Sequence, residues 1–453
     1  MERAYLTRRI VVLGGGFAGI ECARRLESEF GGDMETELVM ISEDNFMLFT
    51  PMLPQVASGM IETRHIILPI RTICKKTKFY EGRIKNIDPH GKLVTLWGTG
   101  DRESISVSYD FLIVALGSET NFFGMADVEQ NAYTMKTLND AVMLRNRVID
   151  MFEQAENEND SAIKKSLLSF VVAGGGFAGI ETAGELMDLL LDARIHYPAI
   201  HRRDLSVVVL EALPMILPGF DPGLAEFARK KMTSRGIDIR LKTAVTGFDG
   251  SQVMTKQLGD DPRSPVDSRA GGISARTLVW TAGVTPVNTI KRSVFKTQKG
   301  KMVVNEYLEV ADFPGVFAVG DCAMCIEPGS QKPYPPTAQV ATVQAKAAIR
   351  NLTALVRGKK KEAFAYKTRG QMAIIGKRTG IATILGMNVS GFWAWIIWRN
   401  VYLSKIPTFE KKFRILLDWV IDLFFDRDIS RLRLTRRYVE KEYRPLDEVD
   451  DVW

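Results

Sequence analysis

Two glycine-rich segments have the residue types and spacing that bring a protein backbone against a phosphate group. Residues 11–21 are VVLGGGFAGIE and residues 171–181 are VVAGGGFAGIE, so ten of the eleven positions are identical. Each copy has three glycines at GxGxxG spacing, namely Gly14, Gly16 and Gly19, then Gly174, Gly176 and Gly179. The first glycine permits a tight turn, the second admits a pyrophosphate, and the third lets helix and strand pack closely. The repeat indicates two dinucleotide sites, although two glycine-rich turns in unrelated α/β units are the alternative.

Each loop also lies between the two elements that such a site needs. The β-branched runs 10–12 and 171–172 precede the loops and are typical of buried parallel strands. The helix that follows directs its free N–H groups and the positive end of its dipole at the phosphates. Phe17 and Ala18, at the start of the first helix, are therefore expected to contact the cofactor together with the glycines.

An acidic residue after the second strand of such a unit binds a ribose hydroxyl. In the second copy the strand 206–210 ends at Glu211, and no arginine follows directly. A 2′-phosphate would meet a carboxylate there, so the sequence favours NADH over NADPH. In the first copy the strand 37–41 ends at Ser42 and Glu43. Glu43 is the expected ribose ligand, but it lies one place late, so Ser42 and a solvated Glu43 remain alternatives.

Three further apolar strands end in small residues. The strands 111–116 and 278–281 carry Ala115 with Gly117 and Ala282 with Gly283 at their ends, and both are expected to return beside a nucleotide. The strand 316–319 ends in Gly320 and Asp321. A carboxylate there accepts a hydrogen bond from a cofactor hydroxyl, although Gly-Asp alone is only a turn signal.

Composition sets the limits for the elements that position these residues. The chain has 453 residues, 46% hydrophobic residues and a net charge of +6, which predicts two or three domains of ordinary globular type. So small a positive charge suits an anionic cofactor or a membrane surface and does not indicate nucleic acid. Cys322 and Cys325 have no matching second pair, so we expect no metal site. No apolar run is long enough for a transmembrane helix.

Taken together, the motifs resemble those of the type II NADH:quinone oxidoreductases, in the superfamily of two-dinucleotide-binding flavoproteins. The resemblance rests on the doubled GGGFAG and on further segments in the same order along the chain: Phe49-Thr50-Pro51-Met52-Leu53, Trp280-Thr281-Ala282-Gly283-Val284, Gly320-Asp321-Cys322 and Pro335-Pro336-Thr337-Ala338-Gln339. It implies bound FAD as the permanent cofactor, NADH as a substrate and a membrane quinone as the acceptor.

The resemblance also implies the architecture. We expect an α/β protein with two Rossmann-like domains, in which an FAD domain of residues 1–125 and 286–385 is interrupted by an NADH domain of residues 126–285. A C-terminal module of amphipathic helices, residues 386–453, would follow and associate with the membrane.

A helix that starts after the two prolines is expected on the quinone side of the flavin. Thr337 would cap it, and Ala338 and Gln339 would lie in its first turn beside FAD. The family pattern AQxAxQ is shifted here, because the second glutamine is Gln344. Five residues of helix place Gln339 and Gln344 roughly 140° apart. Gln339 is therefore the stronger candidate for quinone binding, and Gln344 the weaker one.

The cysteines separate this chain from related enzymes. No CxxxxC pair follows Cys22, and no cysteine lies between Cys74 and Cys322. Disulfide reductases and sulfide:quinone oxidoreductases need redox cysteines at such places, so hydride is expected to pass from NADH directly to the flavin. The resemblance places Glu181 near the nicotinamide, where it would orient the substrate or relay protons. A glutamate that complements the helix dipole is the alternative.

The C-terminal part of the chain is rich in aromatic and basic residues. The run 392–398, FWAWIIW, is followed by lysines and by apolar residues at helical spacing over 413–425. Aromatic and cationic residues together suit the boundary of a bilayer, although a pair of core helices or a homodimer interface is the alternative. We expect a peripheral membrane protein on the cytoplasmic face of the cell membrane or a matrix-like face of an organelle.

Two other functions remain open from the sequence. One is a quinone reductase that uses sulfide or another donor, which the missing cysteines disfavour. The other is a flavoprotein that senses NADH without turnover. Turnover with a soluble quinone separates the second from an NADH:quinone oxidoreductase.

Overall fold

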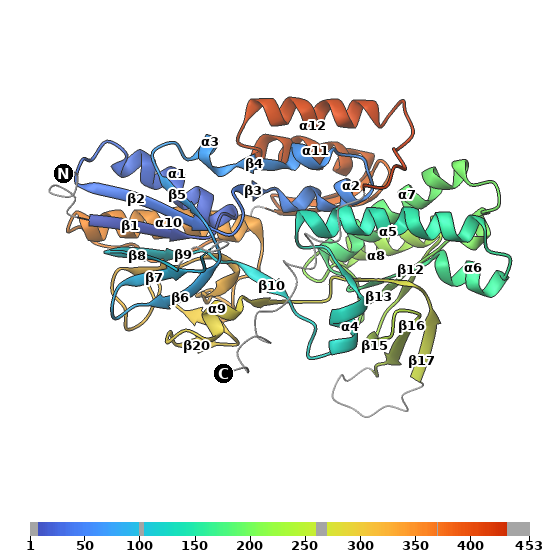
Figure 1. The fold of residues 1–453 in the computed structure, drawn as a ribbon, viewed down its shortest axis with the longest axis horizontal. Helices are drawn as coiled ribbons and strands as arrows, with labels where there is room; N and C mark the ends of the chain where they lie inside the picture. Colours follow the sequence, from blue (N-terminus) through green and yellow to red (C-terminus); the bar gives the residue numbers. More distant parts are fainter. Residues whose placement is uncertain (1–7, 99–103, 260–269, 369, 433–453) are drawn as a thin grey trace.

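Two five-stranded parallel sheets, each carrying one of the glycine loops, organise the molecule (Figure 1). The computed structural model describes residues 8–98, 104–259, 270–368 and 370–432, so the outermost parts of the expected ranges 1–125 and 386–453 lie outside the described residues. The first sheet has the order β22-β9-β1-β2-β5. Its strands are β1 (Arg8–Leu13), β2 (Thr36–Ser42), β5 (Lys78–Glu81), β9 (Phe111–Val114) and β22 (Val316–Ala318).

The second sheet repeats this plan, with the order β11-β18-β12-β13-β14. Its strands are β11 (Tyr133–Thr134), β12 (Ser169–Ala173), β13 (Ser206–Leu210), β14 (Ile237–Arg240) and β18 (Thr277–Trp280). Residues Val171, Val172, Val207 and Val209 are completely buried, as expected of a parallel sheet that is covered on both faces.

The chain order of the two sheets shows that one unit is inserted into the other. After β9 the chain leaves the first sheet through β10 (Ser118–Thr120), and after β18 it returns through β19 (Val284–Pro286). These two segments pair as an antiparallel ribbon, and β22 then completes the first sheet. The expected α/β fold with a discontinuous first domain is therefore confirmed.

Helices cover both sheets. The helix α1 (Phe17–Phe30) follows the first loop and packs against α10 (Ala338–Val356). The helix α7 (Phe177–Ala193) follows the second loop. The helix α5 (Leu138–Glu156) packs near α2 (Leu53–Ala57). Further helices up to residue 356 are α3 (Ile70–Ile73), α4 (Ala126–Asn131), α6 (Ser161–Leu167), α8 (Pro222–Ser234) and α9 (Asn288–Lys291). Short 3₁₀ turns are η1 (Thr50–Met52), η2 (Thr63–Ile66), η3 (Arg194–His196), η4 (Arg202–Asp204) and η5 (Gly320–Cys322).

Small antiparallel sheets accompany the two units, and two of them pack on a face of a parallel sheet. They are β3 (Phe46–Leu48) with β4 (Ile67–Pro69), β6 (Ile84–Asp88) with β7 (Leu93–Leu96) and β8 (Ile105–Ser108), and β15 (Thr243–Phe248) with β16 (Gln252–Gln257) and β17 (Ala270–Ser274). A further sheet joins β20 (Thr297–Gln298), β21 (Lys301–Val303) and β23 (Ala323–Met324).

The C-terminal module begins with a sheet, which differs from the helical module expected from residue 386. The strands β24 (Gly370–Gly376), β25 (Thr379–Ile384) and β26 (Met387–Gly391) form one antiparallel sheet before α11 (Phe392–Lys405) and α12 (Phe409–Ile421). Residue 386 lies in the turn between β25 and β26, so a boundary there would divide a hydrogen-bonded sheet. Among the described residues, no helix combines the length and apolarity needed to cross a bilayer.

Candidate functional site

The first glycine loop has the backbone geometry of a phosphate-binding turn. Gly14 has φ +102°, and a Cβ there would lie 2.3 Å from the carbonyl oxygen of Ala115. A Cβ at Gly19 would lie 1.8 Å from the carbonyl oxygen of Gly14, whereas at Gly16 it would meet nothing within 4 Å. The first and third glycines are thus required by packing, and the second leaves open space at the start of α1. This opening fits a pyrophosphate at the N-terminus of the helix.

The second loop repeats this geometry. Gly174 has φ +105°, a Cβ at Gly179 would lie 1.9 Å from the carbonyl oxygen of Gly174, and the position at Gly176 is open. Ala282 and Gly283 follow β18, as expected of a returning strand, and a Cβ at Gly174 would lie 3.0 Å from Cα of Ala282. The two loops therefore have the same shape, as their sequences predict.

The expected ribose ligands take different positions in the two units. Glu211 is buried directly after β13, and its carboxylate accepts hydrogen bonds from the amides of Gly175 at 2.5 Å and Leu213 at 2.7 Å. A carboxylate has further lone pairs with which to accept from a ribose. In the first unit Ser42 has the equivalent position, because Ile41 pairs with Leu13 as Leu210 pairs with Ala173. Glu43 lies one residue further and is exposed.

Asp321 lies in η5, next to the first glycine loop. Its Oδ2 accepts a hydrogen bond from the Ser118 hydroxyl at 2.7 Å, and Ser118 accepts one from the Lys136 ammonium at 2.8 Å. Gly320 has φ +77°, and a Cβ there would lie 3.8 Å from Cβ of Ala18. The Gly-Asp turn thus lies against the start of α1, where a hydroxyl-bearing cofactor bound at Gly16 would extend. Gly117, at the end of the β9 segment, also has positive φ and open space around it.

The two glutamines of α10 have different surroundings. Thr337 caps the helix as expected, because its hydroxyl accepts a hydrogen bond from the amide of Val340 at 3.2 Å. Gln339 follows Ala338 in the first turn and donates to the hydroxyl oxygen of Tyr366. Gln344 is buried, and its Oε1 accepts a hydrogen bond from the amide of Gly320 at 2.7 Å. The structure therefore places Gln344 behind the Gly-Asp turn and Gln339 at the end of the helix.

Glu181 lies in α7, one turn after the second glycine loop, beside aromatic residues of α11. The pKa of Glu181 is raised to about 8, mainly by burial and also by the negative charge of Glu185. A hydrogen bond from the Ile374 amide at 3.0 Å opposes this rise. Burial and the charge of Glu181 also raise the pKa of Tyr402. The ring of Tyr402 lies 4.4 Å from that of Trp398, measured between centroids. The raised pKa brings the titration of Glu181 close to neutral pH, where its carboxyl group can exchange a proton.

Further acidic residues continue from Glu181 along the buried side of α7. Glu185, Asp188 and Asp192 follow, and the ion pairs of Arg427 with Glu185 and Asp192 measure 3.4 Å each. Arg427 also pairs with Asp422 at 3.2 Å. Burial raises the pKa of Glu185 to about 7, and Arg427 opposes this rise. The C-terminal segment therefore supplies a positive charge to these carboxylates, beside Arg235 at Asp188 and Lys377 at Asp192.

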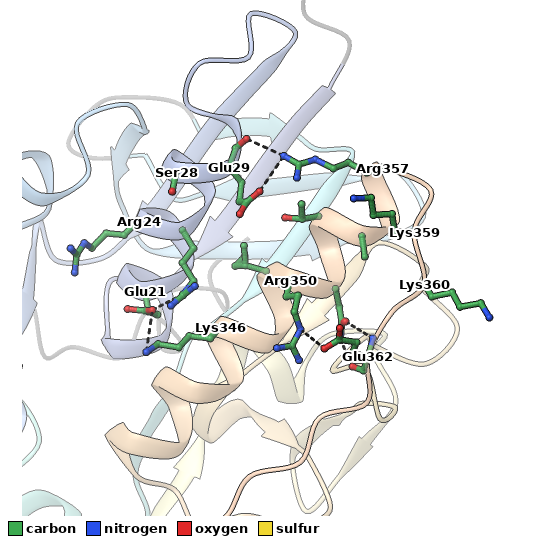
Figure 2. Close-up of a pocket in the computed structure, with 15 residues that line it drawn as sticks. Glu21, Arg24, Ser28, Glu29, Lys346, Arg350, Arg357, Lys359, Lys360 and Glu362 are labelled. Carbon is green, nitrogen blue, oxygen red and sulfur yellow. Dashed lines mark hydrogen bonds and ion pairs between the residues drawn. The ribbon is translucent and has the colours of Figure 1, made fainter.

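A groove between α1 and α10 lies apart from all of these residues (Figure 2). It is lined by seven basic side chains, several of them in ion pairs with glutamates: Arg24, Arg25, Lys346, Arg350, Arg357, Lys359 and Lys360. None of the expected site residues lines it. Among the described residues, no group of three or more histidine, cysteine or acidic side chains is arranged to hold a metal.

Sequence reasoning missed the residues that join the two units. Ser118, Lys136 and Tyr402 gave no motif, because each acquires its partners through the fold and not through spacing. One signal was present near Lys136, since Thr137 and Asp140 form a capping box that fixes the start of α5.

The two glycine loops, the acid after β13 and the Gly-Asp turn define a flavoprotein with two dinucleotide-binding domains. In agreement, the sequence model of the pyridine nucleotide-disulphide oxidoreductases matches residues 8–345, and that of the NDH2 C-terminal domain matches residues 368–428. The chain belongs to the type II NADH:quinone oxidoreductases of this superfamily.

Individual relatives agree with this assignment. The chain is 32% identical to a probable NADH dehydrogenase of Dictyostelium discoideum, over 93% of this chain and 91% of that protein. It is 30% identical to the type II NADH:quinone oxidoreductase of Mycobacterium tuberculosis, over 92% and 89% of the two chains. The fold resembles that of NDH2 from Plasmodium falciparum, with a TM-score of 0.84 and 19% identity, over 93% of this chain and 99% of that one.

Proposed function

We propose that this protein oxidises NADH through bound FAD and passes the electrons to a membrane quinone, without pumping protons. The observation that carries the proposal is the pair of equivalent dinucleotide loops in one chain, each with an open position at its second glycine. The four cysteines are free and buried, which supports direct transfer between the nicotinamide and the flavin.

The residues divide into two groups around the cofactor. The loop at Gly14, Gly16 and Gly19 and the carboxylate of Asp321 would hold FAD, which supplies the electron acceptor for NADH and the donor for the quinone. The loop at Gly174 and the carboxylate of Glu211 would hold NADH. Because Glu211 is buried beside the loop amides, a 2′-phosphate would meet a negative charge at low dielectric, which supports NADH as the preferred substrate.

The acceptor site is proposed at the N-terminal end of α10. Free N–H groups of its first turn, together with the side-chain amide of Gln339, would stabilise negative charge on the reduced flavin, on the side that faces the quinone. Glu181, with its raised pKa, would relay a proton or orient the substrate. NADH and quinone would then use separate places beside the flavin.

The exposed apolar face of the C-terminal helices supports attachment to a membrane surface. It consists of large apolar side chains that are each at least 43% exposed, namely Phe392, Trp393, Phe409, Phe413, Leu416, Leu417, Val420, Ile421, Leu423, Phe424 and Phe425. In Figure 1, α11 and α12 lie together along one edge of the molecule. Lys405, Lys411, Lys412 and Arg414 accompany this face, as suits anionic headgroups on the cytoplasmic or matrix-like side. A homodimer that buries the same face is the competing arrangement.

The test is purification followed by two kinetic measurements. The protein should be yellow and release FAD on denaturation, and NADH should reduce the flavin in a stopped-flow instrument. A short-chain quinone should reoxidise it with multiple turnovers. Colourless, folded protein that FAD cannot reconstitute would overturn the proposal. Reduction without turnover would favour an NADH sensor, and reduction by sulfide in preference to NADH would favour a sulfide-dependent enzyme.

A further inference from the structure

A chain of two hydrogen bonds connects the NADH unit to the proposed FAD ligand Asp321. The ammonium of Lys136 lies 2.8 Å from the Ser118 hydroxyl, and that hydroxyl lies 2.7 Å from Oδ2 of Asp321. The direction of both bonds is determined by chemistry. An ammonium only donates, so Ser118 accepts from Lys136 and must direct its single hydrogen toward the carboxylate.

The three residues come from elements that the fold holds independently. Lys136 precedes α5, and its backbone amide donates to Oδ2 of Asp140 at 2.8 Å, within the capping box of that helix. Ser118 is the first residue of β10 and pairs with Pro286 in the ribbon that joins the two units. Asp321 belongs to η5. A small shift of any of these elements would therefore change the position of the Asp321 carboxylate.

The surroundings of Lys136 differ from those of a surface lysine. Burial lowers the pKa of Lys136, and the negative charge of Asp321 opposes this change. The nearby Lys291 provides a contrast, because it forms a solvent-accessible ion pair with Glu119 at 3.1 Å on the same ribbon. A charge that is partly buried between two domains acts mainly on its fixed partner.

We propose that Lys136 is a positioning residue for FAD, which acts through Ser118 to fix the Asp321 carboxylate in the orientation that accepts a ribityl hydroxyl. This inference rests on the proposed function, because it requires FAD in the unit of the first glycine loop. It adds that the FAD site is completed by a residue of the NADH unit, so that the two units are coupled at this contact.

The experiment measures FAD affinity by titrating the apoprotein with FAD, together with the absorption spectrum and midpoint potential of the bound flavin. Lys136→Met and Ser118→Ala should each weaken FAD binding by about tenfold, the effect of about 1.4 kcal/mol, and should shift the flavin spectrum. Lys136→Arg should restore most of the affinity. Lys291→Met is the matched control and should bind FAD like the wild type.

A double-mutant cycle separates positioning from a general effect on folding. If Lys136 acts through Asp321, Lys136→Met should weaken binding little further in an Asp321→Asn background. Additive losses, or unchanged affinity, spectrum and potential in both Lys136→Met and Ser118→Ala, would overturn the inference. If Lys136→Met does not fold, Ser118→Ala decides the question. Failure of the wild type to bind FAD would instead overturn the proposed function.

Discussion

Ser42 and Glu43 show how one residue of register changes what a cofactor would meet. Ser42 has the position that Glu211 has in the second unit, and a Cβ at Gly15 would lie 2.6 Å from the Ser42 hydroxyl oxygen. The corresponding Cβ at Gly175 would lie 2.9 Å from Oε2 of Glu211. The two otherwise equivalent loops therefore present a neutral hydroxyl and a carboxylate. This difference offers a physical basis for binding different dinucleotides.

Glu211 is the residue for which nucleotide preference is most directly testable. Glu211→Gln should narrow the preference of kcat/KM for NADH over NADPH by about tenfold or more, because removing the charge removes its repulsion of the 2′-phosphate. The substitution also disturbs the bonds to Gly175 and Leu213, so the ratio of the two substrates is the informative quantity. Equal use of both nucleotides by the wild type would show that Glu211 does not contact the ribose.

The glutamines of α10 should separate the two half-reactions. Gln339→Leu should slow reoxidation of the flavin by quinone up to about tenfold, the loss of one hydrogen bond, and leave reduction by NADH almost unchanged. Gln344→Leu should affect quinone reoxidation less. Its main effect should be weaker FAD retention, because the partly buried amide of Gly320 loses its acceptor. Stopped-flow traces of each half-reaction decide this, and a slower reduction step alone in Gln339→Leu would place the quinone elsewhere.

Local features of the sequence predicted the loops, the strand-end residues and the cap at Thr337, because each depends on residues that are close in the chain. The contacts of Asp321 could not be predicted in this way. Ser118 lies 203 positions away, and only the ribbon of β10 and β19 brings it there. The sheet β24–β26 was not predicted, because the more conspicuous aromatic run 392–398 follows it directly.

The helix α12 has two unlike faces, and the exposed one should be a membrane contact. Ile415 and Trp419 are buried, and the Trp419 indole donates to Oε1 of Gln55 at 3.1 Å. Phe413 and Leu417 are 52% and 43% exposed. These two can therefore be changed without disturbing the core, whereas deletion from residue 386 would cut the sheet of β24–β26.

Phe413→Glu combined with Leu417→Glu should lower binding to vesicles that contain phosphatidylglycerol by at least about tenfold. The reason is that burial of each apolar side chain in the bilayer contributes about 1.5–3 kcal/mol to the free energy of binding. Flavin reduction by NADH should be unaffected. Val294→Glu is the control, since Val294 is 64% exposed just beyond α9, which lies away from α12 in Figure 1. Unchanged vesicle binding with a shift from dimer to monomer in sedimentation would show that this face is a subunit interface.

Helix α12 and the segment after it together contact both dinucleotide units. Asp418 of α12 contacts His65 of the first unit at 2.5 Å. Further along, the amide of Leu432 donates to Asn146 at 2.9 Å, and Arg431 pairs with Asp150 at 2.6 Å, both on α5 of the second unit. Arg427 lies between these contacts. Arg427 thus connects the C-terminal segment to α7, the helix that carries Glu181.

Arg427 should be the residue on which this connection most depends. Its side chain is only 2% exposed, so Arg427→Met would leave the buried Glu185 carboxylate without its ion-pair partner and should cost about 3–5 kcal/mol. The exposed pair of Arg431 should contribute much less, and Arg431→Met is the control. The measurement is thermal or denaturant unfolding of the FAD-loaded protein.

The loss in Arg427→Met should also depend on pH in a defined direction. The pKa of Glu185 is already raised to about 7, and Arg427 is the charge that opposes the rise, so removing it raises that pKa further. Between pH 4.5, the ordinary pKa of a glutamate, and its raised pKa in the folded protein, the carboxyl group binds a proton in the folded state but not in the unfolded state. Stability therefore falls as pH rises through this window. Arg427→Met should consequently be destabilised more at pH 8 than at pH 5.5, relative to wild type at each pH. A pH-independent difference would mean that packing by Arg427, and not neutralisation of the α7 carboxylates, holds the segment in place.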